Sequence, residues 1–134
     1  MAFRDDTWLL HRLNHLWDTY FPDVTQDNPV FINFGRYSKL RLGSIRLDRR
    51  TKKTYITITS MFKDQAIPES VVDHTIVHEM CHYTHGFSSL KPRQHRFPHS
   101  GGIVNKELRQ RGAGSLLKAY SDWLKEYRRS FSVI

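Results

Sequence analysis

Two histidines and a glutamate in the segment "HTIVHEMCHYTHG" (residues 74–86) constrain this chain more than any other feature. His78 and His82 are four positions apart, and Glu79 follows the first of them. On an α-helix, residues four apart project from the same face about one turn apart. Two neutral imidazoles on that face can each donate a lone pair to one Zn²⁺ ion. The segment therefore predicts a helix that carries two metal ligands, with Glu79 beside them.

The residues around the motif favour a helix. Pro68 and Glu69 are typical of a first helical turn, and Gly86 is typical of the position where a helix ends. Four apolar residues supply the stripe that such a helix buries: Val72, Ile76, Val77 and Met80. The alternative is a helix with two surface histidines and an unrelated acid, which this helical and apolar context makes the weaker interpretation.

A catalytic zinc ion needs a third protein ligand and keeps its fourth position for water. The candidates downstream of the motif are His85, His95, His99 and Glu107. His99 lies between "FP" and "SGG", where the next helix should begin, and the sixteen residues after His82 let the chain loop back to the metal. Glu107 falls inside that next helix, which is where a glutamate would serve as third ligand. The spacing favours His99 and leaves the other three open.

Such a site predicts the hydrolysis of a peptide bond. Zinc acidifies its bound water and polarises a carbonyl group, and Glu79 would act as the general base. Tyr83, His85 and Tyr55 are candidate donors to the developing oxyanion, and the sequence does not choose among them. The strand expected at 54–62 precedes the helix, and our hypothesis is that it forms the sheet edge to which an extended substrate adds as a strand.

Length and composition indicate one folded domain over residues 1–134. The chain is 39% hydrophobic and 13% aromatic, which is enough to build a core. Its apolar stretches are far shorter than the roughly 20 residues that a membrane span needs. Residues 1–21 lack the uninterrupted apolar centre of an export signal. Cys81 is the single cysteine, so it cannot form an internal disulfide. We therefore expect a cytoplasmic protein, associated with the nucleoid in a bacterium or nuclear in a eukaryote.

Positive charge is concentrated in the later part of the chain. The net charge is +8, with −3 over residues 1–35 and +11 over residues 36–134. A basic surface attracts nucleic acid by releasing counterions, although a solvated basic surface explains the same composition. Two basic runs near the predicted site are candidate phosphate contacts. Their cations are Lys91, Arg93, Arg96, Lys106, Arg109 and Arg111.

The pattern of apolar residues predicts a small α+β domain. Helices are expected at 6–21, 67–86, 103–111 and 115–131, and strands at 29–34, 39–48 and 54–62. The polar run "DRRTKK" (48–53) separates the last two strands, so they should pair as a hairpin. The result is a three-stranded antiparallel or mixed sheet, followed by the helix with the histidine motif and two further helices.

Five segments resemble the SprT-like zinc metallopeptidase domain, the family that includes the Spartan proteases. "LNHLWDTYFPD" (13–23) is similar to the first helix of that family, and "LGSIRLD" (42–48) with "ITITSMF" (56–62) to its strands. "VVDHTIVHEMCHYTHG" (71–86) is close to its active-site helix, and "HRFPHSGGIVNKELRQRG" (95–112) to the segment that opens the next helix. A Cys-rich zinc ribbon, found after this domain in many relatives, is not expected in a chain with one cysteine.

The resemblance implies a zincin-like fold and a zinc metallopeptidase. It carries His78, His82 and His99 over as metal ligands and Glu79 as the general base. It also implies protein or peptide substrates, including proteins crosslinked to DNA. Two other functions remain open: a non-catalytic nucleic-acid-binding module that zinc only braces, and a zinc hydrolase that attacks a phosphodiester.

Overall fold

A computed structural model describes residues 3–132. Along the chain, the helices and strands are α1 (Asp6–Tyr20), β1 (Val30–Phe34), β2 (Gly43–Asp48), β3 (Lys53–Ile58), α2 (Glu69–Thr84), α3 (Ile103–Gln110) and α4 (Gly114–Ser132). Two short 3-10 turns, Ser60–Lys63 and Ser100–Gly102, precede α2 and α3 respectively. The predicted α+β class and the predicted order of the elements are confirmed.

The three strands form a mixed sheet in the order β1-β3-β2. β2 and β3 pair as the predicted antiparallel hairpin, while β1 runs parallel to β3. Both later strands are shorter than predicted. β2 begins only at Gly43, and β3 ends at Ile58 because the hydroxyl of Thr59 accepts a hydrogen bond from the amide of Met61 and starts a 3-10 turn.

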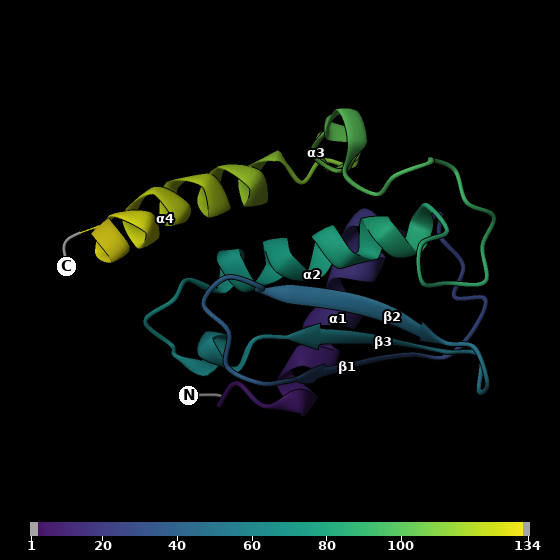
Figure 1. Cartoon of the computed structure of the whole chain (residues 1–134), viewed down its shortest axis with the longest axis horizontal. Coiled ribbons are helices and arrows are strands. Elements are labelled where there is room, and N and C mark those ends of the chain that lie inside the picture. The colour runs from purple at the N-terminus through teal and green to yellow at the C-terminus, as the bar shows by residue number, and fades with distance from the viewer. Residues whose placement is uncertain (1–2, 133–134) are drawn as a thin grey trace.

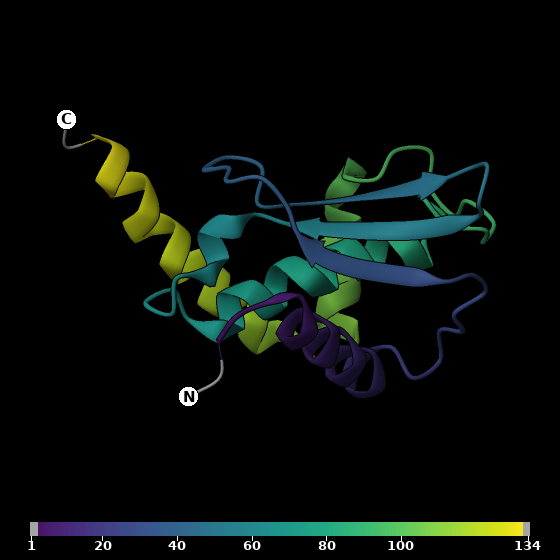
Figure 2. The ribbon, with the colours of Figure 1, turned by 90° about the horizontal axis from the view of Figure 1, so that it is seen from below.

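Helices cover one face of this sheet in two layers (Figures 1 and 2). α1 packs on β1, and α2 packs on β2 and β3. α3 and α4 lie on the far side of α2. α2 is therefore the central helix, and thirteen of its sixteen residues are buried. That burial explains why the sequence of α2 is apolar on more than one face.

Two polar contacts fix α2 against the rest of the fold. The guanidinium of Arg12 on α1 donates two hydrogen bonds to the carboxylate of Asp73, at 3.0 and 2.7 Å. Near the other end, the hydroxyl of Tyr83 donates a hydrogen bond of 2.7 Å to the side chain of Asn28. The indole of Trp17 packs edge-on against the Tyr83 ring. These contacts hold the helix that carries the histidine motif at both ends.

The prediction that β3 forms a sheet edge was wrong. β3 is the central strand, and its backbone pairs with β1 on one side and β2 on the other. β2 is the edge strand that lies beside α2. Within residues 3–132, none of the helices is long and apolar enough to cross a membrane.

Candidate metal centre

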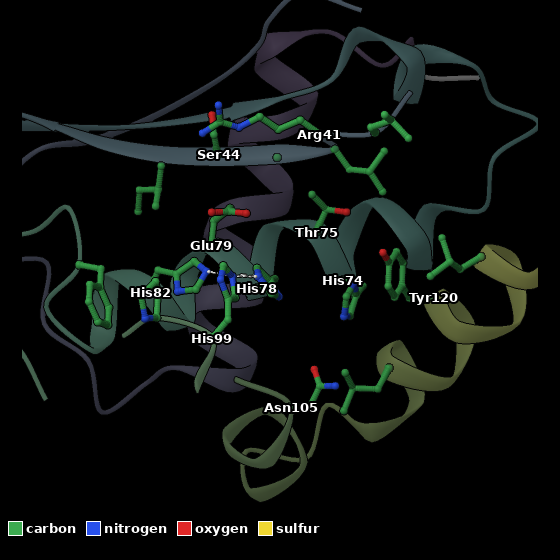
Figure 3. Close-up of a pocket in the computed structure, with 18 of the residues that line it drawn as sticks. Arg41, Ser44, His74, Thr75, His78, Glu79, His82, His99, Asn105 and Tyr120 are labelled. Atoms are coloured by element: carbon green, nitrogen blue, oxygen red, sulfur yellow. Dashed lines mark hydrogen bonds between the residues drawn. The ribbon is translucent and has the colours of Figure 1, made fainter. Parts of the chain in front are cut away.

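The three predicted histidine ligands meet at one point. The Nε2 atoms of His78 and His82 lie 3.2 Å apart, and that of His99 lies 3.3 Å from the first and 3.1 Å from the second. Figure 3 shows the three rings converging at the wall of a cavity. Within residues 3–132, these three residues form the one group of three or more His, Cys, Asp or Glu side chains that could hold a metal ion.

The distances among these nitrogen atoms fit a metal ion better than hydrogen bonds. A neutral imidazole carries one N–H, so each Nε2 either donates or accepts. In a triangle of three such atoms, any choice of tautomers leaves at least one pair of like groups facing each other. Two nitrogens bound to one tetrahedral zinc at about 2.0–2.1 Å lie about 3.3 Å apart, close to the three separations found here. The donor set therefore fits a zinc ion.

Different elements supply these ligands. His78 and His82 are one turn apart on α2, and His99 comes from the segment that joins α2 to α3. Gly101 and Gly102, directly after His99, both have φ of +66°, a conformation that L side chains rarely adopt. The two glycines let the chain turn from His99 into α3. His82 is buried and His99 is exposed, so the centre faces a cavity that is open to solvent.

The surroundings keep the histidines of α2 neutral. Burial, together with the neighbouring imidazoles of His74 and His99, lowers the pKa of His78 to about 4. Burial, with His78 and His99 nearby, lowers the pKa of His82 to about 3. A neutral imidazole offers the lone pair that a metal needs, so both side chains are prepared as ligands at neutral pH.

Glu79 lies between α2 and β2, next to the histidine cluster (Figure 3). Its side chain is buried, and burial raises its pKa to about 7, against the influence of the positive charge of Arg41. A cation held by the three imidazoles would favour the ionised carboxylate. Glu79 could then accept and return a proton near neutral pH, as a general base must.

The cavity around this centre has a volume of about 900 Å³. α2 forms its floor, and β2 with the segment before it forms one wall. The opposite side is formed by Asn105 and Arg109 of α3 and by side chains of α4. The α4 residues are Leu117, Tyr120, Ser121 and Leu124. The cavity thus extends from the histidines along α2 toward an apolar end.

Two of the other candidates for third ligand are engaged elsewhere. His85 is fully buried, and its Nε2 lies 2.7 Å from a carboxylate oxygen of Glu107. The second oxygen of Glu107 accepts a hydrogen bond from Arg111. The ring of His95 packs edge-on against that of His85, with centroids 4.6 Å apart. The pair of His85 and Glu107 joins α3 to the end of α2, and neither these two residues nor His95 belongs to the group of converging nitrogens.

None of the three predicted oxyanion donors lines the cavity. Tyr83 donates its hydroxyl hydrogen to Asn28, and His85 is paired with Glu107. Tyr55 lies on the uncovered face of the sheet, where Arg46 packs over its ring. Sequence reasoning missed two cavity residues, His74 and Tyr120. The spacing of His74, four residues before His78, was the signal for the first.

Two of the predicted phosphate contacts are held by carboxylates. The ammonium of Lys91 lies 2.8 Å from a carboxylate oxygen of Asp27. Arg111 is paired with both Glu107 and Asp23, at 2.9 and 2.7 Å. Both cations therefore contribute to the fold, and a phosphate would have to compete with these acids.

The other four predicted phosphate contacts are exposed. Arg93 lies over the ring of Phe87, with its guanidinium carbon 4.6 Å from the centroid. Arg96 and Lys106 are exposed on the loop and on α3 respectively, and Arg109 lines the cavity. Nucleic-acid binding by these residues stays a prediction.

Comparison of the chain with protein-family models, with curated proteins and with solved structures finds no match. The resemblance to SprT-like metallopeptidases therefore stays a prediction.

Proposed function

We propose that this protein is a zinc-dependent metalloendopeptidase. His78, His82 and His99 would hold the zinc ion through their Nε2 atoms, and Glu79 would be the general base. The observation that carries the proposal is the meeting of these three nitrogens in an open cavity that Glu79 also lines. A structural zinc is closed off by four protein ligands, whereas a catalytic zinc has three and an open position. The described part of the chain offers three.

Zinc, when bound, supplies a Lewis acid that acidifies water and polarises a carbonyl group. The residues of the chain supply proton transfer. A carboxylate oxygen of Glu79 takes a proton from the attacking water and passes it to the nitrogen of the departing amine. The new C–O bond replaces the C–N bond, so the products are a carboxylic acid and an amine. Glu79 returns to its starting charge.

The edge strand favours a polypeptide as the substrate. Residues Gly43, Ser44 and Ile45 of β2 line the cavity, and β2 is paired on one side only. An extended peptide could add to β2 as a further strand, and the backbone hydrogen bonds would hold it along α2. A compact phosphodiester has no use for a strand edge, which makes phosphodiester hydrolysis the weaker alternative.

The proposal extends to a SprT-like enzyme with a zincin-like fold that cleaves proteins bound or crosslinked to DNA. Exposed cations on the loop before α3 and on α3 itself, Arg93, Arg96, Lys106 and Arg109, support an approach of DNA to these segments, and Arg109 also lines the cavity. The competing function is a nucleic-acid-binding module in which zinc only braces the fold. Glu79 argues against it, because a purely structural site has no use for a buried acid beside an open coordination position.

Glu79→Gln tests the reaction. The amide keeps the size of the side chain but cannot take a proton, so cleavage should fall by about 10²–10⁴-fold. One zinc per chain and the melting temperature should be retained. Cleavage of an unfolded protein is measured with and without single-stranded DNA, and Glu126→Gln, an exposed change on α4, is the control.

The outcome of the cleavage assay decides between a peptidase and a nucleic-acid-binding module. Stimulation of wild-type cleavage by DNA would support action on DNA-bound proteins, and indifference to DNA would leave a general peptidase. No cleavage by a wild-type protein that holds one zinc and retains DNA would refute the peptidase and favour the binding module.

A further inference from the structure

His74 is a buried polar residue without a hydrogen bond. The residue is 5% exposed, and neither ring nitrogen has a hydrogen-bond partner among the described residues. A buried donor or acceptor without a partner carries the full cost of its desolvation. Such groups are rare in folded proteins. A residue selected for packing alone would be apolar at this position.

The position of His74 is next to the metal centre. It lies on α2 one turn before His78, with 6.1 Å between the two ring centroids. Its ring lines the same cavity, and Figure 3 shows it pointing from α2 into the space that Asn105 borders on the other side. The ring of His74 is therefore part of the wall of the cavity that would receive the substrate.

Tyr120 holds the imidazole in this orientation. The two rings are stacked, with centroids 4.1 Å apart and an angle of 11° between their planes. Burial also lowers the pKa of His74 to about 4, so the ring is neutral and presents one N–H and one lone pair. A neutral donor on a fixed ring suits a neutral acceptor such as a carbonyl oxygen.

We propose that His74 is a substrate-binding residue whose ring N–H donates a hydrogen bond to a main-chain carbonyl of the polypeptide, with Tyr120 as the positioning residue. The substrate class rests on the proposed function. An extended chain advances about 3.3 Å per residue. The 6.1 Å between the rings of His74 and His78 therefore places this carbonyl one or two residues from the scissile bond.

Binding to the cobalt-substituted protein tests this inference without hydrolysis, because the visible bands of Co²⁺ report a ligand at the metal. Three probes are compared. Acetohydroxamate reaches the metal alone, and two tripeptide hydroxamates extend from it in opposite chain directions. The variants are His74→Phe, which keeps the stacking on Tyr120, and His74→Gln, which keeps an N–H donor. His11→Phe, the same change at an exposed position of α1, is the matched control.

His74→Phe should weaken one of the two tripeptide hydroxamates by about tenfold, the value of one hydrogen bond. Acetohydroxamate should bind as before, and His74→Gln should recover part of the loss. The melting temperature of His74→Phe should rise, because an unsatisfied buried group is removed. A purely structural histidine would lower it. His11→Phe should leave both hydroxamate binding and the melting temperature unchanged.

The inference is overturned if both tripeptide hydroxamates bind His74→Phe as tightly as the wild type. It is also overturned if His74→Phe loses cobalt and melts at a lower temperature. A wild-type protein that binds a tripeptide hydroxamate through His74 yet cleaves no polypeptide would refute the proposed reaction and leave this inference standing.

Discussion

A single methyl group added at Gly43 should slow peptide cleavage without removing the metal ion. Gly43 is the first residue of β2, and its backbone lies directly against α2. A Cβ added at Gly43 would lie 2.7 Å from the Cγ2 of Thr75 and 3.2 Å from the Oε2 of Glu79. Carbon atoms pack best at roughly 3.5–4.0 Å, so β2 or the side chains of α2 must move.

The structure sets the size of the effect of Gly43→Ala. Overpacking of this kind costs about 1–3 kcal/mol, and the stiffer unfolded chain of an alanine variant offsets about 0.4–1 kcal/mol of it. We expect a net loss of about 1–2 kcal/mol in the free energy of unfolding. Because the displaced group includes the carboxylate of Glu79, the turnover number should fall at least tenfold, since misplacement by about 1 Å can cost about 10²-fold.

Zinc content, urea unfolding and peptide cleavage are measured on the same preparations. Zinc should remain at one per chain, since the three atoms nearest the added methyl group belong to Thr75 and Glu79. Gly114→Ala is the matched control, because no atom lies within 4 Å of its added Cβ and it begins α4. Its activity should be unchanged and its stability equal or slightly higher. Wild-type cleavage rates in Gly43→Ala would show that Glu79 does not need this close contact with β2.

Two further predictions concern the metal and the pH. Removing zinc with a chelator should lower the melting temperature, as measured by calorimetry. Adding free zinc at 100 times its dissociation constant should restore about 2.7 kcal/mol of the free energy of unfolding. Identical melting with and without zinc would contradict a bound ion. In the metal-free protein, the pKa of His74 is lowered from 6.5 to about 4, so below pH 6.5 the unfolded chain binds a proton that the folded chain does not. Stability should therefore fall by up to about 3 kcal/mol from pH 6.5 to 4, and His74→Phe should lack this part of the fall in urea unfolding; equal pH dependence would contradict it.

The part of the site that could be predicted from the sequence lies on one helix. The four-residue spacing of His78 and His82 fixes their relation as soon as α2 forms, whatever the rest of the fold does. The same rule places His74 on that face, and sequence reasoning did not use it. Residues on a single regular element are the ones that a spacing rule can bring together.

The third histidine needed more than a spacing rule. Sixteen residues separate His82 from His99, and a loop of that length can return to α2 in many ways. The sequence favoured His99 through the "SGG" that follows it, and the structure brings it to the other two nitrogens. It leaves His85 and Glu107 in a pair with each other. That pairing depends on the packing of α3 on α2, for which the sequence carried no signal.

The wrong prediction about the sheet edge also arose because the sequence does not show how separate elements pack together. It has the larger consequence for function, because it concerns the strand that a substrate could meet. A short turn obliges β2 and β3 to pair, but it does not say on which side of the hairpin β1 joins. β1 joins β3, and this leaves the outer edge of β2 without a neighbouring strand beside the cavity, where the hydroxyl of Ser88 donates a hydrogen bond to the carbonyl of Ile45. Had β1 joined β2 instead, the free edge would belong to β3. The placement of one strand, set by the packing of α1 on β1 and of α2 on the hairpin, therefore decides which backbone a substrate can meet.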